Sequence, residues 1–152
     1  MPSRADAQPE DRPPASLARR LGYALKHAQL RLAEISGPAL APLGIDGREL
    51  GVLVVLADGE PLSQQQAARR LAIDRTTMVA MIDGLEDKGL VARRLDPRDR
   101  RRNIVEPTPA GRETLRKAMQ VTDEVERRFL APLGEPEAQR FKDALVLLLG
   151  HS

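Results

Sequence analysis

Residues 63–107 place two short helix signals directly before a charged hairpin, and this order restricts the fold more than any other feature of the chain. The first helix is predicted for "QQQAARRL", with Ser63 and Gln66 spaced as a capping box. The second follows Asp74, a natural N-cap, and ends at Gly89. Two β-prone segments, "LVARRL" and "NIVEPT", flank the turn "DPRDRRRN". Two short helices joined by a tight turn and followed by a hairpin predict a winged helix-turn-helix.

A longer apolar pattern precedes this unit. From Leu17 to Ile35, apolar residues recur at helical spacing on two sides of one predicted helix, residues 16–36, with Ser16 as its N-cap. A helix with two apolar faces needs two partners, such as its own core and a second subunit. The segment "SGPALAPLGI" is expected to be a loop. After it, Asp46 and Glu49 have the spacing that opens a helix over "GRELGVLVVLAD", which Gly59 closes.

Two further helices are predicted after the hairpin. Thr108 followed by Pro109 is typical of a helix start, and Pro136 opens the last helix. That helix contains "FKDALVLLLG", which is apolar nearly all round and is most easily explained by a subunit interface. The expected fold is mainly α. It has a winged helix-turn-helix lobe with a two-stranded wing at about residues 44–107, and dimerisation helices at about residues 16–36 and 108–150.

Length and composition fit one domain with an aliphatic core. The chain has 152 residues, of which 41% are hydrophobic but only 2% aromatic, so Leu, Val, Ala, Ile and Met must fill the core. Residues 1–15 contain four prolines and almost nothing to bury. This predicts a disordered N-terminal tail before a single domain of residues 16–152.

Several classes of function are not expected. The absence of cysteine excludes disulfides, thiol redox sensing and Cys-ligated zinc, and no metal-ligand cluster accompanies the two histidines, His27 and His151. No apolar run reaches membrane-spanning length and no signal peptide is seen, so a cytoplasmic protein without a membrane partner is expected. Neither a nucleophile–base pair nor a glycine-rich phosphate loop is present, so neither an enzyme nor a bound cofactor is expected.

The charge is unevenly distributed. The formal net charge is only +2, yet residues 69–102 contain ten basic and six acidic residues, a local charge of +4 that leaves −2 for the rest. A local excess of this kind in a nearly neutral chain is typical of a face that binds a polyanion.

The helix after Asp74 has an inner and an outer face. Its inner stripe, Met78, Met81, Ile82 and Leu85, is assigned to the core. The outer face carries small side chains, hydroxyls and an arginine. Threonine can bond bases or phosphates and arginine reads guanine, so such a face suits the major groove. The alternative is an ordinary solvated face, and the adjacent basic hairpin favours DNA. The predicted recognition residues are Arg75, Thr76, Thr77, Val79 and Ala80.

The tip of the hairpin is the second predicted DNA contact. A hairpin beside a recognition helix lies over the adjacent minor groove, whose negative potential suits arginine. Asp99 is expected to orient the guanidinium of Arg101 by a charge-assisted bond, while the other arginines contact phosphates or share the insertion. The alternative is a solvated loop in a chain where 20 of 24 basic residues are arginine. The predicted wing residues are Arg98, Asp99, Arg100, Arg101 and Arg102.

With these motifs the chain resembles the MarR family of winged-helix transcriptional regulators. The resemblance runs from about Leu43 to Gly111 and includes "LEDKGLVAR", the wing "DPRDRR" and the helix entry "TPAG". It implies a homodimer whose first, fifth and sixth helices interlock. Its two lobes would bind a roughly palindromic operator in double-stranded DNA, with recognition helices about one turn (~34 Å) apart. By the family pattern, Asp99 and Arg101 match the wing, and residues 75–77 match the start of the recognition helix.

The resemblance also marks supporting residues and departures. Ser63 and Gln64 are expected to support the helix-turn-helix. Ala80 stands where many members carry a polar or basic reader, so part of the base contact is expected to be missing or moved. Pro107 stands where leucine is usual. Because proline has no amide donor, the second wing strand is expected to end by Glu106.

A small-molecule effector is a further implication, since the family often binds aromatic or phenolic acids between the dimer helices and the winged lobe. Tyr23 and His27 are one helical turn apart, with Arg31 a further turn along, and these three are the candidate lining of such a pocket. We favour the simpler interpretation that Tyr23 and His27 pack in the dimer interface with their polar tips satisfied.

The expected function is therefore sequence-specific regulation of transcription, by a homodimeric repressor on a pseudo-palindromic operator that a small aromatic ligand of unknown identity releases. Two alternatives stay open. One is an architectural DNA binder without sequence preference, and the other is a protein-interaction module whose basic wing meets an acidic partner.

Overall fold

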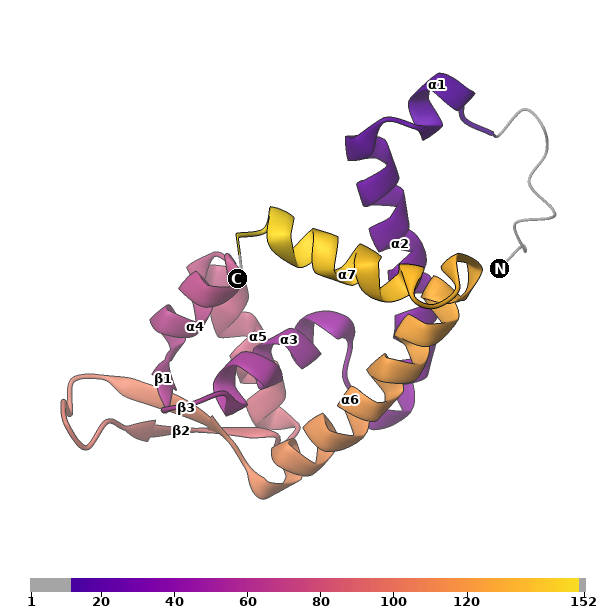
Figure 1. The fold of residues 1–152 in the computed structure, drawn as a ribbon. Helices are drawn as coiled ribbons and strands as arrows, with labels where there is room; N and C mark the ends of the chain where they lie inside the picture. Colours follow the sequence, from indigo (N-terminus) through magenta and orange to yellow (C-terminus); the bar gives the residue numbers. More distant parts are fainter. Residues whose placement is uncertain (1–11, 151–152) are drawn as a thin grey trace.

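The structure is a computed structural model that describes residues 12–150, in which helices pack against a small sheet at one edge of the molecule (Figure 1). The elements in chain order are α1 (Ala15–Ala18), α2 (Leu21–Leu40), the 3-10 turn η2 (Ala41–Leu43), α3 (Gly47–Ala57), β1 (Leu62–Ser63), α4 (Gln64–Leu71), α5 (Arg75–Asp87), β2 (Val91–Leu95), β3 (Asn103–Pro107), α6 (Pro109–Leu130), the 3-10 turn η3 (Ala131–Leu133) and α7 (Glu137–Leu148).

The hydrophobic core lies in the lobe that α3, α4, α5 and the sheet form, with α6 packed against it. As the composition predicted, it is aliphatic, and its fully buried members include Val52, Leu53 and Val105. The inner stripe of α5 is confirmed for Met78, Ile82 and Leu85, which are buried, whereas Met81 is half-buried at the edge of the core.

Side-chain caps define where the helices of the lobe begin. Four residues that the sequence identified as helix starts accept a hydrogen bond from the backbone amide three residues further on, which satisfies one of the amides that a helix N-terminus leaves unpaired. Both predicted capping boxes are also complete. The four cap residues are Asp46, Ser63, Asp74 and Thr108.

The predicted two-stranded wing is confirmed as the hairpin of β2 and β3, and it belongs to an antiparallel sheet in the order β1-β3-β2, whose third strand the sequence did not predict. The missing strand, β1, pairs Leu62 with Val105 and is only two residues long, which is too short to show any alternation in sequence. The expected end of the second wing strand at Glu106 was wrong by one residue. Pro107 pairs with Val91 at the last position of the ladder, where a missing amide donor disturbs little.

The N-terminal helical region differs from its prediction at both ends. A short helix, α1, begins after Pro14 and includes Ser16, so Ser16 is not its N-cap. The chain then breaks at Arg20, whose backbone is extended (φ −71°, ψ 131°), before α2 starts. "SGPALAPLGI" is not a loop. Helix α2 runs through Pro38 to Leu40, because a proline this close to a helix end removes only one internal hydrogen bond.

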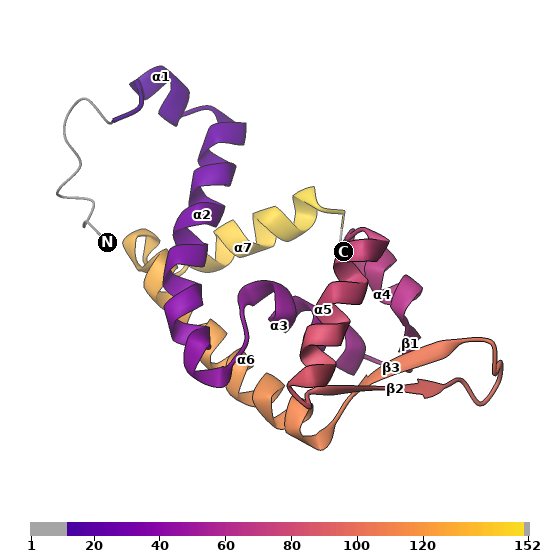
Figure 2. The ribbon, with the colours of Figure 1, turned by 180° about the vertical axis from the view of Figure 1, so that it is seen from behind.

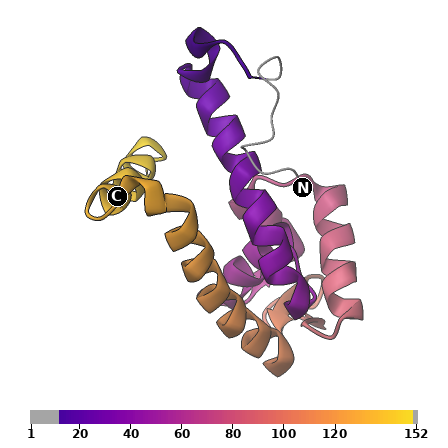
Figure 3. The same cartoon turned by 90° about the vertical axis from the view of Figure 1, so that its right-hand side faces the viewer.

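Two long helices, α2 and α6, run alongside each other next to the lobe (Figure 3). They leave much apolar surface uncovered in the single chain, and α7 has no buried residue at all. None of the helices among residues 12–150 has the length and apolar character needed to cross a membrane. Of the predicted tail, residues 1–11 lie outside the described residues, and Ala15 already belongs to α1. In α1, α2, α6 and α7, the exposed large apolar residues include Leu17, Leu21, Leu25, Leu30, Met119, Phe141, Val146, Leu147 and Leu148.

Candidate nucleic-acid interface

The turn between α4 and α5 fixes the start of the candidate recognition helix. Ala72 ends α4 in the left-handed conformation (φ 51°), and the amide of Ile73 donates to the carbonyl of Ala68 at 3.0 Å. Asp74 then accepts from both the amide and the hydroxyl of Thr77, at 2.8 and 2.6 Å. The hydroxyl bond, helped by the amide bond, lowers the pKa of the Asp74 carboxyl, which therefore stays charged at the helix N-terminus.

The outer face of α5 presents the predicted recognition residues unequally. Arg75, Thr76 and Ala80 are exposed, whereas Thr77 and Val79 are half-buried. Because Thr77 donates its hydroxyl proton to Asp74, its oxygen can only accept further hydrogen bonds. Thr76 makes no side-chain hydrogen bond within residues 12–150, so its hydroxyl is the one on this face that can both donate and accept.

Helix α5 stands as a ridge between two grooves. One groove, of about 450 Å³, lies between α4 and α5, and the other, of about 460 Å³, lies between α5 and the start of α3. The second groove is lined by Arg48, Thr76 and Ala80 among others. The first groove is lined by both Arg69 of α4 and Arg75 of α5. The sequence did not single out Arg69 as a candidate DNA contact. Arg69 lies one helical turn after Gln65, which lines the same groove. A ridge of small side chains flanked by arginine can enter a major groove.

The tip of the wing is an ordered turn, closed where the amide of Asp96 donates to the carbonyl of Arg102 at 2.9 Å. The Asp96 carboxylate accepts from the amide of Arg98, and the Asp99 carboxylate accepts from the amide of Arg101 at 3.1 Å. The expected bond from Asp99 to the guanidinium of Arg101 is not among the hydrogen bonds of residues 12–150, where the Asp99 carboxylate accepts from the backbone amide of Arg101. The two aspartates shape the turn, as Asx turns do.

The wing side chains are exposed, and one of them bends back to the lobe. Arg98, Arg100 and Arg101 point into solvent, whereas Arg102 approaches the Ser63 hydroxyl at 3.4 Å. Ser63, predicted as a supporting residue, is buried at the junction of β1 and α4.

Ion pairs divide the ten basic residues of segment 69–102 into two groups. Lys88 pairs with Glu49, Arg93 with Asp83 and Glu86, and Arg94 with Glu106. The other seven form no ion pair with any residue in the described part of the chain, so they remain available to an anion. These seven are Arg69, Arg70, Arg75, Arg98, Arg100, Arg101 and Arg102.

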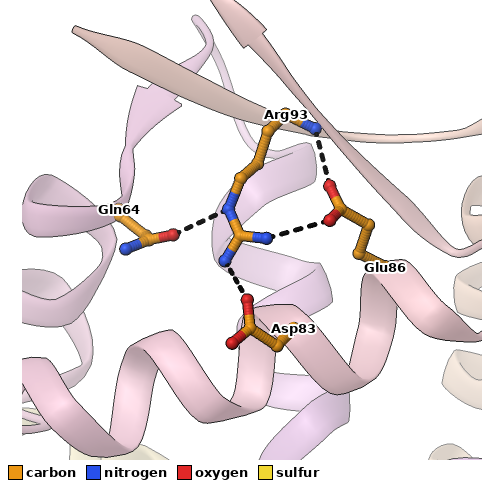
Figure 4. Close-up of polar contacts among 4 residues, drawn as sticks. All are labelled: Gln64, Asp83, Glu86 and Arg93. Atoms are coloured by element: carbon orange, nitrogen blue, oxygen red, sulfur yellow. Dashed lines mark hydrogen bonds and ion pairs between the residues drawn. The ribbon is translucent and has the colours of Figure 1, made fainter.

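Arg93 joins the wing to both helices of the helix-turn-helix (Figure 4). From strand β2, its Nε donates to Gln64 at 2.9 Å, its Nη1 to Glu86 at 3.0 Å and its Nη2 to Asp83 at 2.5 Å. Gln64, the other predicted supporting residue, contributes the contact from α4. The sequence places Glu86 and Arg93 in the motif "LEDKGLVAR" and Gln64 among the supporting residues, but it does not show that they meet, because the partners of Arg93 are seven to 29 positions away.

Helices α4 and α5 and the hairpin lie at one end of the molecule, away from α1 and the middle of α2, in both Figure 1 and Figure 2. The recognition helix and the cationic tip can therefore face the same ligand. Together with the order of elements, this arrangement defines a winged helix-turn-helix protein.

The candidate effector residues lie together on another part of the chain. The rings of Tyr23 and His27 are stacked with their centroids 4.0 Å apart. With Arg31 they line an open groove of about 810 Å³ between α2 and the end of α6, where Phe129 is also found. No cluster of His, Cys, Asp or Glu suited to a metal ion occurs among residues 12–150.

Comparison with known proteins agrees with this class. The model of the MarR family matches residues 43–102. The transcriptional repressor Rv2887 of Mycobacterium tuberculosis is 31% identical over 128 residues, which are 84% of this chain and 92% of that protein. Its crystal structure in complex with DNA superposes with a TM-score of 0.73, at 30% identity, over 85% of this chain and 97% of that one.

Two further solved structures are similar over nearly their whole length. A probable transcriptional regulator from Pseudomonas aeruginosa has a TM-score of 0.80 and 31% identity, covering 87% of this chain and 98% of that one. CouR from Rhodococcus jostii RHA1, bound to p-coumaroyl-CoA, has a TM-score of 0.74 and 29% identity, covering 87% and 93%. The chain belongs to the MarR family, as its motifs predicted.

Proposed function

We propose that this protein is a homodimeric repressor of transcription that binds a pseudo-palindromic operator through α5 and the wing. The observation that carries the proposal is a group of seven arginines on α4, α5 and the wing tip, which form no ion pair with any residue between 12 and 150 and lie beside the exposed hydroxyl of Thr76. Repression is supported by the likeness to Rv2887, a repressor crystallised with DNA. Such a regulator acts where the chromosome is, which in bacteria is the cytoplasm.

Competition between duplexes tests this function. The full-length protein first selects binding sites from a random duplex library, and the enriched duplex then competes with calf-thymus DNA at fixed salt. We expect the enriched duplex to be two-fold symmetric and to bind at least about 10³-fold more tightly than bulk DNA. Equal binding would support the architectural alternative. No binding to either DNA would contradict the proposal and support the protein-interaction module.

The dimer is proposed to form through α1, α2, α6 and α7, the helices expected to interlock. Leu147 and Leu148, at the end of α7, are 75% and 76% exposed in the single chain, which is costly for large aliphatic side chains in water. A second copy would cover this surface and place two winged lobes side by side. Sedimentation should give twice the chain mass, and a stable monomer would contradict the interface.

An aromatic acid is the proposed effector, and the groove of Tyr23, His27 and Arg31 is its proposed site. The stacked rings supply an aromatic wall and Arg31 a partner for a carboxylate. The likeness to CouR, bound to p-coumaroyl-CoA, supports an aromatic effector; that ligand is a thioester, so the pairing of Arg31 with a carboxylate rests on the groove alone. Titration with p-coumarate and p-coumaroyl-CoA should release the enriched duplex, and Arg31→Ala should weaken that response about tenfold. If Arg31→Ala bound the ligand as tightly as the wild type, the effector site would not be this groove.

A further inference from the structure

We propose that Arg93 is a positioning residue of the DNA-binding surface. It fixes the wing to the recognition helix and so sets affinity for the operator without contacting DNA. The inference rests on the proposed function, because it concerns how the same surface is held in shape. Figure 4 shows the arrangement, with the guanidinium between Gln64 of α4 and the two carboxylates of α5.

The charge of Arg93 is fully engaged within the lobe. Nε, Nη1 and Nη2 each donate to a different residue, and the side chain is only 22% exposed. Two carboxylates, Asp83 and Glu86, neutralise one guanidinium. A phosphate approaching this point would meet a net negative cluster. The contacts to DNA phosphates, which release counterions, must therefore come from other arginines.

The same contacts are the main polar connection between the wing and the two helices. Arg93 also has its backbone amide directed at Glu86, at 3.3 Å, so both the strand and its side chain are held by α5. The only other side-chain hydrogen bond from the hairpin to α4 or β1 in the described residues is the 3.4 Å approach of Arg102 to Ser63. Without Arg93, the β1–β3 pairing would still hold the hairpin to the lobe, but β2 would lose its side-chain connection to α5, and the tip arginines would be held less firmly relative to that helix. Two groove contacts held at a fixed distance bind cooperatively, and a loose connection weakens them.

Arg93→Met tests the proposal, since methionine keeps an unbranched apolar stem and removes every donor. We expect the Kd for the enriched duplex to rise about 10- to 100-fold, because bonds to charged groups are among the strong ones. The Kd for calf-thymus DNA should change less than about threefold, because non-specific binding depends on the free cations. A general loss of folded protein would weaken both to the same extent.

Arg94→Met is the matched control. Arg94 is the next residue of the same strand and is paired with Glu106 across the hairpin, and its side chain forms no hydrogen bond or ion pair with α4 or α5. The substitution Arg94→Met removes the same charge as Arg93→Met, and we expect it to change operator affinity less than about threefold. Equal losses in the two variants would overturn the specific role of Arg93.

A double-mutant cycle separates positioning from direct contact. In a protein that already carries Asp83→Asn and Glu86→Gln, the further effect of Arg93→Met should fall to about threefold or less. The slope of log Kd against log salt should be the same in Arg93→Met as in the wild type. The proposal would be overturned if Arg93→Met reduced the salt slope by about one and still caused its full loss of operator affinity in the protein that carries Asp83→Asn and Glu86→Gln. That result would show that Arg93 contacts phosphate.

Glu86→Gln keeps the test decisive if Arg93→Met does not fold. It leaves the side chain's shape and one acceptor in place and removes one ion pair, so a 3- to 10-fold loss of operator affinity at unchanged thermal stability is expected. No loss in folded Glu86→Gln would contradict the proposal. Failure of the wild type to enrich any duplex would instead refute the proposed function, which separates the two outcomes.

Discussion

Arg101→Ala is expected to raise the Kd for the enriched duplex about 10- to 100-fold. Arg101 is exposed at the tip of the wing and pairs with no residue in the described part of the chain, so its whole charge is available to DNA. Loss of one phosphate or groove contact should also reduce the slope of log Kd against log salt by about one. Fluorescence anisotropy at several salt concentrations measures both quantities.

Arg140→Ala is the control for this loss. Arg140 is an exposed arginine of α7, paired with Glu137 at 2.7 Å, and its removal changes the net charge by the same amount. It should leave the affinity and the slope within about twofold of the wild type, because exposed pairs contribute little. Unchanged operator binding in a folded Arg101→Ala dimer would refute the role of the wing tip.

Gly111→Ala is expected to destabilise the protein severely. A Cβ at position 111 would lie 1.9 Å from the carbonyl oxygen of Leu90, a backbone atom that cannot move aside easily. The same carbonyl accepts from the amide of Thr108 at 3.0 Å, so the start of α6 packs directly on the start of β2. We expect a loss of about 3 kcal/mol or more in the free energy of unfolding, at the upper end for overpacked sites. Urea denaturation followed by circular dichroism measures it.

Gly84→Ala provides the comparison, because it adds the same methyl group inside α5, where no atom beyond the neighbouring residues and the helix's own backbone lies within 4 Å. It should stabilise the protein by up to about 1 kcal/mol, since alanine is the better helix former. Equal stability of Gly111→Ala and the wild type would show that α6 does not approach β2 as closely as the structure has it.

Local signals made most of the lobe predictable. Caps such as Asp74 and Thr108 act through backbone amides three residues away, so their evidence lies within a few positions of sequence. The inner stripe of α5 follows from helical spacing, and the hairpin follows from two β-prone segments around a turn. The motifs of the family then connected these elements to one fold.

Features that depend on distant residues could not be predicted. Arg93 meets Gln64 across 29 positions. Its place at the end of the motif "LEDKGLVAR" does not show which residues it contacts. Strand β1 exists only because β3 lies beside it. Asp99 was expected to bind a guanidinium, but its carboxylate accepts from the backbone amide of Arg101 within the turn.

Site-directed cleavage of DNA tests most directly whether α5 and the wing lie on a duplex together. The chain has no cysteine, so a single introduced cysteine can carry an iron chelate that cuts nearby DNA. On the enriched duplex, Ala80→Cys is predicted to cut within each half-site and Arg100→Cys in the adjoining minor groove, whereas Gln139→Cys on α7 should not cut. Cleavage that is equal from all three positions, or absent from Ala80→Cys and Arg100→Cys at full occupancy, would contradict the account.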